Sequence, residues 1–208
     1  IIYFMERRNF LQSSVLLPFI GINPSILTNI SETSEDPIKP FLLPNQPALE
    51  NKGTMDIRVW VRSGFTNGLF SSVECAVAPK IMGPAPHGHL ELDELMYVLE
   101  GTASVLLGDE VVEIQAGGWH MRPRMIKHTF FNASEKPLRF IDMYFNQPFE
   151  EYLEAVFHQL TPENGYPSGS PKKSEEIKRL SEKFGLIRYD DAQDQKQQLI
   201  KEYGLKNG

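Results

Sequence analysis

The sequence predicts an all-β fold, a sandwich or small barrel of short strands, with helices at its C-terminal end. Between residues 54 and 147, short apolar or alternating runs recur at regular spacing and are separated by glycine turns. This pattern is typical of β-sandwiches, jelly rolls and small barrels. From Pro148 onward the apolar residues recur at helical spacing instead. The chain of 208 residues is therefore expected to hold one β domain with extensions.

The composition restricts the classes of function. Hydrophobic residues make up 41% of the chain, enough for one sizeable core, and the net charge of −6 provides no basic surface for nucleic acid. Cys75 is the single cysteine, so an intrachain disulfide is excluded and a buried, unreactive thiol is expected. The sequence contains no phosphate-binding loop, dinucleotide-binding fingerprint, Ser-His-Asp arrangement or Cys-x-x-Cys pair.

Residues 1–30 differ in character from the rest of the chain. The pair Arg7-Arg8, then Phe10-Leu11 and a moderately apolar run, resembles a bacterial twin-arginine (Tat) export signal. The run is too short and too interrupted by Pro and Gly to span a bilayer as a helix, so no stable membrane span is expected. The alternative is an N-terminal arm that packs on the domain or on a partner subunit. A functional signal would make the protein periplasmic or secreted, and otherwise it would be cytoplasmic.

Residues 31–53 are rich in Ser, Glu, Asp, Pro and Asn, and are expected to form a linker or an extended arm. The β domain then covers residues 54–147. Turns are expected at Asn67-Gly68, Gly108-Asp109 and Gly117-Gly118, with a hairpin around the second of these. The predicted strands are 56–61, 70–78, 95–99, 103–107, 111–114, 119–122, 129–132 and 138–145. The His-x-His segment between the second and third of these is expected to be β-like.

Residues 148–208 are expected to form a helical extension. The first helix starts near Pro148, which suits the first helical position. Ser174 is expected to cap a second helix that Gly185 ends. Residues 191–203 form a weaker third candidate. These helices are expected to pack on the outside of the barrel.

Four side chains able to bind a metal ion fall in the β domain, namely His87, His89, Glu94 and His128. Residues i and i+2 of a strand face the same side, so the imidazoles of His87 and His89 should lie side by side. Glu94 follows His89 by an odd number of residues, so a kink between them is needed to bring it to that side. Glu91 shares strand parity with the histidines and is the alternative carboxylate.

These residues resemble the two motifs of the cupin superfamily. The first motif places His-x-His, three or four residues, Glu, six residues and Gly after a leading glycine, as in the segment that runs from Gly83 to Gly101. In the second motif, Pro123 and Asn132 flank His128 at the expected spacing, and Met125 stands where the family has a second glycine. Each motif occurs once.

The resemblance implies a single-domain cupin with a double-stranded β-helix, or jelly-roll, barrel. It also implies that His87, His89, Glu94 and His128 bind one divalent transition metal ion. Imidazole and carboxylate ligands suit Mn, Fe, Ni, Co, Cu or Zn. The segment around the first motif is similar to single-domain proteins grouped with quercetin dioxygenases, which implies a dioxygenase-like oxidoreductase. Glu94 is then also the expected catalytic residue, accepting a proton from the substrate.

Strand parity predicts which other side chains face the site. Met96 and Val98 share parity with Glu94, and Phe130 shares parity with His128, so a largely apolar pocket is expected around the metal. His120 is expected to face solvent or a hydrogen-bond partner. The nearby arginines, Arg122 and Arg124, are candidates for binding a substrate carboxylate.

Two other functions stay open. One is a metal-dependent isomerase or epimerase of sugars or keto acids, which calls for a more polar pocket with a Lys or a further acid inside. The other is a non-catalytic cupin that binds a small molecule. A small-molecule substrate or ligand is expected in every case, and a homodimer is what the resemblance implies for the assembly.

Overall fold

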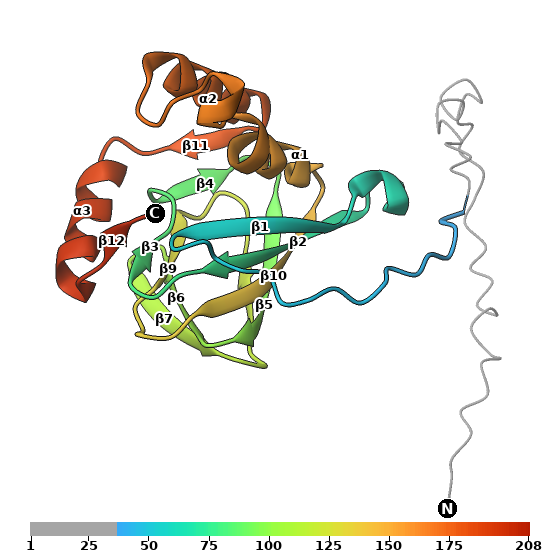
Figure 1. Cartoon of the computed structure of the whole chain (residues 1–208), viewed down its shortest axis with the longest axis horizontal. Coiled ribbons are helices and arrows are strands. Elements are labelled where there is room, and N and C mark those ends of the chain that lie inside the picture. Colours follow the sequence, from blue (N-terminus) through green and yellow to red (C-terminus); the bar gives the residue numbers. More distant parts are fainter. Residues whose placement is uncertain (1–36) are drawn as a thin grey trace, which may run out of the picture. The chain divides into compact units, whose positions relative to one another are not determined.

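The computed structural model describes residues 37–208 (Figure 1). The predicted export signal at residues 1–30 lies outside the described residues. No helix within residues 37–208 is both long enough and apolar enough to cross a membrane.

Two β-sheets build the domain, which confirms the predicted fold class (Figure 1). The first sheet is antiparallel throughout and has its strands in the order β1 (Met55–Val61), β2 (Phe70–Val77), β10 (Leu138–Phe145), β5 (Asp93–Glu100) and β8 (Trp119–Arg122). The second sheet contains β11 (Leu186–Arg188), β4 (His87–His89), β9 (His128–Asn132), β3 (Ile81–Met82), β12 (Lys206–Asn207), β6 (Thr102–Leu107) and β7 (Glu110–Gln115).

Every predicted strand is present in the structure, and most strand ends lie within one or two residues of the predicted ends. Strands β6 and β7 form the predicted hairpin. The sequence patterns missed β3, β11 and β12, which contain only two or three residues each. Such short segments have no readable periodicity, and pairing with a neighbouring strand creates them. A short 3-10 helix, η2 (Ser63–Thr66), precedes the predicted turn at Asn67-Gly68.

The hydrophobic core lies between the sheets. Burial alternates along β5 and β10, so that Met96, Val98 and Phe140 point inward and are fully buried. Because the two strands are paired, their inward residues lie opposite one another, as in Phe140 opposite Val98. This alternation is the period-2 signal that predicted the strands.

Two motif glycines are required by close backbone approach. Gly101 turns the chain from β5 into β6 with φ +79°, and a Cβ there would collide with the carbonyl oxygen of Pro137. At Gly83 a Cβ would collide with the carbonyl oxygen of Phe130, to which the Gly83 N–H donates at 3.1 Å. These glycines hold the strands at the distance that the site requires.

The C-terminal extension is helical, as predicted. Helix α1 (Phe149–Glu154) starts directly after Pro148 and continues as a π-helical turn, η3 (Ala155–Gln159). A short 3-10 helix, η4 (Pro162–Asn164), leads to α2 (Pro171–Lys183), and α3 (Ala192–Tyr203) follows.

The predicted cap of the second helix is wrong by four residues. Ser170, not Ser174, is the N-cap, and its side chain accepts a hydrogen bond from the Lys173 N–H at 3.3 Å. Pro171 takes the first helical position, a signal that the sequence contains. Gly185 follows the helix with φ +58°, as expected for its end.

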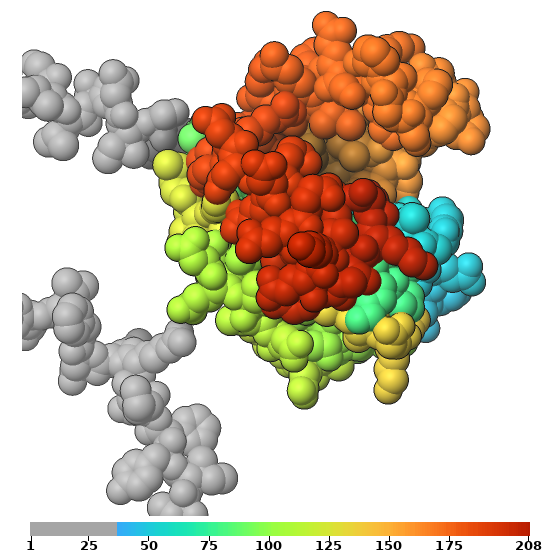
Figure 2. Space-filling model, turned by 90° about the vertical axis from the view of Figure 1, so that its left-hand side faces the viewer, coloured from blue at the N-terminus to red at the C-terminus, as the bar shows by residue number. Residues whose placement is uncertain are grey.

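The helices are part of the barrel's packing. Phe149, Leu180 and Phe184 belong to the same hydrophobic cluster as the barrel interior. Figure 2 shows α3 and the C-terminal residues, in red, covering one side of the barrel, with α2, in orange, beside them. On that side β12 pairs with β3, and β11 pairs with β4.

Candidate metal centre

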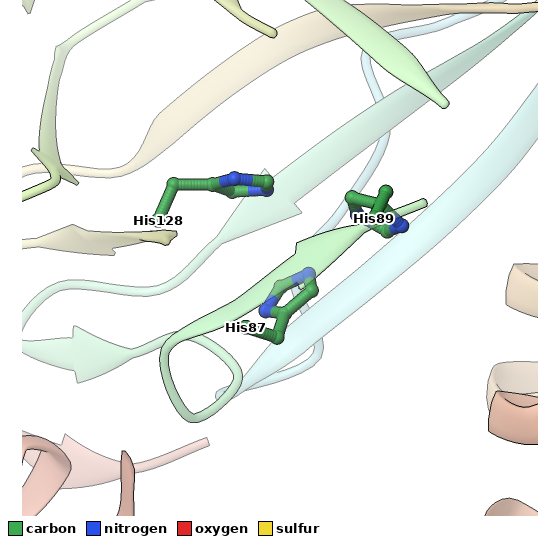
Figure 3. A group of neighbouring side chains, drawn as sticks. All are labelled: His87, His89 and His128. Carbon is green, nitrogen blue, oxygen red and sulfur yellow. The ribbon is translucent and has the colours of Figure 1, made fainter. Parts of the chain in front are cut away.

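Three histidines from two neighbouring strands surround one space (Figure 3). His87 and His89 lie on β4, and their ring centroids are 5.0 Å apart, as the i, i+2 spacing predicts. His128 begins β9 and is the Cα partner of His87 in the antiparallel pair. Each histidine offers a ligand atom, and these atoms all lie within 4.8 Å of one another.

Glu94 reaches the histidines from the opposite sheet. The chain bends at Leu90 and Glu91, leaves the sheet that contains β4, and enters the other sheet as β5. The expected kink is therefore present. It turns the chain and also carries it from one sheet into the other. Glu94 is buried beside the histidines, whereas the alternative carboxylate, Glu91, is exposed.

The distances suit ligands of a common ion. Oε2 of Glu94 lies 2.9 Å from Nε2 of His128, and its Oε1 lies 3.4 Å from Nε2 of His89. Two ligand atoms that each bind one metal ion at about 2.1 Å are roughly 3.0 Å apart at a right angle and roughly 3.4 Å apart at a tetrahedral angle. Glu94 therefore lies against two of the three histidines, while the group of ligand atoms within 4.8 Å of one another consists of the histidines alone.

The backbone fixes the tautomers of two histidines. Nδ1 of His87 is 3.0 Å from the carbonyl oxygen of Ala85, and Nδ1 of His128 is 2.9 Å from that of Ile126. A carbonyl can only accept, so each Nδ1 carries the proton and each neutral ring has a bare Nε2. Nε2 of His128 and both ring nitrogens of His89 are buried without a hydrogen-bond partner among residues 37–208.

This arrangement fits a metal ion. With the proton on Nδ1, Nε2 of His128 and the carboxylate of Glu94 are two acceptors only 2.9 Å apart. Two lone pairs this close repel one another unless a cation lies between them. Buried, unpartnered imidazole nitrogens are costly to leave unsatisfied, and binding to a metal ion would satisfy them.

A buried charge network supports Glu94. Nε of Arg122 lies 3.2 Å from Oε2 of Glu94, and its Nη2 donates to Oδ1 of Asp142 at 2.5 Å. Tyr144, also buried, donates to the other oxygen of Asp142 at 3.4 Å. Burial would raise the pKa of Glu94, but the Arg122 guanidinium, with contacts to His128 and His89, outweighs burial and holds the pKa well below its usual value. Glu94 is therefore an ionised carboxylate.

His87 is also kept neutral. Burial, and to a smaller extent the neighbouring His128 and His89, together lower its pKa to about 3. A neutral imidazole is the form that binds a metal ion. His87 is partly exposed, whereas His89 and His128 are fully buried, so the cluster opens to solvent on the side of His87.

The expected pocket lining is present in part. Met96 and Val98 face the interior and are fully buried, and Phe130 is partly buried with its ring 5.0 Å from that of Phe140. Phe149 of α1 adds an aromatic edge contact to His89 at a centroid distance of 5.0 Å. The sequence did not link this helix to the site.

The prediction of a largely apolar pocket is incomplete. Arg122 is the Cα partner of Glu94, and its side chain is buried among the acids described above. Asp142 is the Cα partner of Met96 on the other side of β5, and it also faces inward. Side chains alternate between the two faces along β8 and β10, and this alternation places both side chains inward. Their position beside Glu94 depends on how these strands pair with β5. Arg124 is exposed and pairs with Asp93 at 2.5 Å.

Two residues of the second motif act on the backbone. The amide of Asn132 is buried and donates to the carbonyl oxygens of Val77, Ala78 and Lys136 at 3.3, 3.1 and 2.7 Å. Met125, which stands where the family has glycine, has φ +65°, and its N–H donates to the carbonyl oxygen of His89 at 2.8 Å. The loop before β9 is thereby tied directly to a proposed metal ligand.

Solved structures give partial matches to this chain at low sequence identity. The structure of KdgF from Halomonas sp. aligns over 48% of this chain and 84% of its own, with 19% identity and a TM-score of 0.42. The plu4264 protein from Photorhabdus luminescens aligns over 51% and 88%, with 20% identity and a TM-score of 0.42. A sugar phosphate isomerase of the cupin superfamily from Silicibacter pomeroyi aligns over 42% and 58%, with 23% identity and a TM-score of 0.37.

Curated protein sequences give no match to this chain. The family model described as the Cupin domain matches residues 73–144, from β2 to β10. This span contains all four proposed ligands and the buried charge network around them. Residues 73–144 thus match the cupin domain, and the two sheets have the fold of the cupin β-barrel.

Proposed function

We propose that this protein is a metal-dependent cupin enzyme that acts on a small aromatic or enolisable molecule, as a dioxygenase-like oxidoreductase. The observation that carries the proposal is the 2.9 Å contact between Glu94 Oε2 and the bare Nε2 of His128, inside a cluster with His87 and His89. A divalent transition metal ion bound there would supply Lewis acidity, or redox chemistry if the ion is redox-active.

The residues of the chain have separate tasks in this proposal. His87, His89 and His128 hold the ion, and the backbone carbonyls of Ala85 and Ile126 orient two of these rings. Glu94 takes part as the fourth ligand and accepts the proton of an acidic substrate hydroxyl or C–H group. The apolar side chains of Met96 and Val98 shield the reacting end of the substrate from water.

A second enzymatic function is supported by the charged side of the pocket. Arg122, Asp142 and Tyr144 bring a buried cation, a further acid and a phenol to the same side as Glu94. This polarity favours isomerisation or epimerisation of a sugar or keto acid, in which proton transfer occurs next to a polarised carbonyl.

Metal content is the first test. The full chain, purified without a chelator or a His-tag, should contain close to one divalent transition metal ion. A His87→Ala, His89→Ala double variant should contain none. A protein that neither carries nor takes up a metal ion contradicts both enzymatic proposals and leaves a small-molecule-binding cupin.

Two assays on the metal-loaded protein then separate the reactions. Oxygen uptake with phenolic and diketone compounds supports the oxidoreductase. Exchange of substrate hydrogen with deuterated water, without oxygen uptake, supports the isomerase or epimerase. Glu94→Gln should abolish either reaction, and the exposed Glu91→Gln is the matched control.

We further propose that the protein is a homodimer. Ile38, Phe41 and Leu42 lie on the extended arm before β1 and are 41%, 48% and 91% exposed. On the outer face of the first sheet, Trp119 and Met121 of β8 are 56% and 42% exposed. Exposed apolar groups of this size are suited to cover one another between two copies. Light scattering should give the mass of a dimer, and a Phe41→Ser, Leu42→Ser variant should be monomeric.

Export through the Tat pathway stays a prediction from residues 1–30. It calls for a fractionation experiment in a bacterial host that has the twin-arginine pathway. The protein should appear outside the cytoplasm, and an Arg7→Lys, Arg8→Lys variant should be retained inside.

A further inference from the structure

His120 faces the inside of the barrel. It is the Cα partner of Met96 in the antiparallel pair of β8 and β5, and opposite residues in such a pair face the same side. Met96 is fully buried in the core. The neighbours of His120 along the strand, Trp119 and Met121, are exposed, which confirms the alternation. His120, for which the sequence leaves solvent or a hydrogen-bond partner open, is thus a half-buried residue on the inner side of β8.

The ring of His120 has an unmet hydrogen-bonding group. Its Nδ1 is buried and has no hydrogen-bond partner among residues 37–208. Burial and the positive charge of Arg122 lower the pKa of His120, which favours the neutral ring. A neutral imidazole offers one donor and one acceptor, and a buried one without a partner is destabilising.

The position of His120 relative to the metal centre is set by the strand. His120 precedes Arg122 by two residues on the same face, which places it about 6.6 Å farther along β8. Arg122 lies against Glu94, so His120 lies beyond the ligands, next to Met96. Along the inner face of this sheet, the fully buried Met96 and its strand partner His120 therefore follow Glu94 and Arg122.

His120 is reachable from outside because β8 is an edge strand and the ring is only partly buried. The ring of His120 is therefore neither fully enclosed in the core nor fully exposed on the surface. A core histidine would be expected to pair with a backbone group, as His87 and His128 do.

We infer that His120 is a substrate-binding residue of the metal centre. Its Nδ1 hydrogen-bonds a polar group at the far end of a small molecule whose other end binds at the metal ion. The matching ligand is a compact molecule with a chelating oxygen pair at one end and a hydrogen-bonding substituent across an apolar ring. The inference rests on the proposed metal centre. It adds the requirement that the ligand has a second polar group, which binds His120.

The test compares two probes on the zinc-loaded full chain. Catechol has only the chelating oxygen pair, and 4-nitrocatechol adds an acceptor across the ring. Zinc has no redox chemistry, so the probes bind without turnover. Titrations followed by absorbance give the affinity of each probe.

In a His120→Phe variant the affinity for 4-nitrocatechol should fall by about 5- to 10-fold, the size of one lost hydrogen bond, with catechol affinity unchanged within about twofold. His120→Asn keeps an N–H near the position of Nδ1 and should recover part of the affinity. Met121→Leu, which faces outward on the same strand, should change neither affinity. Zinc content and the urea midpoint of each variant show whether the site and the fold are intact.

The outcomes separate this inference from the proposed function. Equal losses for both probes in His120→Phe, or no loss for either, overturn the role of His120 and leave the metal centre standing. A wild-type protein that loads zinc but binds neither probe overturns it as well. A wild-type protein that does not load zinc contradicts the proposed function itself.

Discussion

Nε of Arg122 lies 3.2 Å from Oε2 of Glu94, and both side chains are buried in the barrel. The same guanidinium donates to Asp142 at 2.5 Å, so one cation serves two acids away from water. In this environment a charge is stable only if it is paired, because transfer from water is costly. The metal ligand and the fold therefore depend on the same arginine.

Replacing Arg122 by Met should destabilise the protein strongly. The change leaves Glu94 and Asp142 buried without their cation, and the expected loss is about 3–5 kcal/mol in the free energy of unfolding. Urea unfolding monitored by circular dichroism measures this loss. Arg124→Met removes an exposed arginine from an ion pair on the same segment and should cost far less. Similar losses for the two variants would contradict the assigned role of Arg122.

Glu94→Gln should weaken metal binding by at least about tenfold, the scale seen when a metal site loses part of its ligand shell or support. The side chain keeps its shape but loses the charge that lies 2.9 Å from Nε2 of His128. Competition with a chromophoric chelator measures the affinity. Glu91→Gln, on the exposed side of the bend, should bind as tightly as the wild type. A Glu94→Gln protein with unchanged affinity would show that the three histidines suffice.

The metal-free protein should lose stability as the pH falls from about 6.5 to about 3. The pKa of His87 is about 3 in the folded state, against 6.5 for the unperturbed group. Between these values the unfolded chain binds the proton and the folded chain does not, so acid favours unfolding. The slope from this residue is at most about 1.4 kcal/mol per pH unit. Urea midpoints across this range should fall less steeply for His87→Gln, and equal slopes would contradict the prediction.

Asn132→Ala should destabilise the protein by about 2–4 kcal/mol. The two N–H groups of one side-chain amide are shared among the carbonyl oxygens of Val77, Ala78 and Lys136, and alanine removes these hydrogen bonds. Thermal or urea unfolding gives the value. Ser134→Ala, in the same turn, removes a hydroxyl that is less buried and should cost less. A mild effect of Asn132→Ala would mean that water replaces these contacts.

Met125→Gly should stabilise the protein by up to about 1 kcal/mol. Met125 has φ +65°, which is strained for a residue with a Cβ and unstrained for glycine. Its side chain is 60% exposed, so little packing is lost. Met125→Ala keeps the strain and is the control that should show no gain. A Met125→Gly protein less stable than the wild type would show that the exposed thioether makes contacts worth more than the strain.

Much of the fold could be predicted from the sequence because its signals are local. Apolar and polar residues alternate along β5 and β10 because only one side of each strand faces the core. The strands and the inward position of Met96 and Val98 could therefore be predicted from the sequence. The spacing of His87 and His89 likewise determines that their imidazoles share a face. Gly185 predicts the end of α2, whereas the start lies at the Ser170-Pro171 pair and not at Ser174, because proline suits the first helical position after a serine cap.

The sequence by itself determined the β domain, the helical extension and four candidate ligands. The tertiary structure decided what surrounds those ligands. Alternation can say that Arg122 and Asp142 face inward, but only the register of β8 and β10 against β5 places them beside Glu94. His120 needed the same register to be placed inside the barrel. The register depends on how strands that are far apart in the chain pair with one another. Local sequence spacing does not determine this pairing, which is settled only in the folded protein.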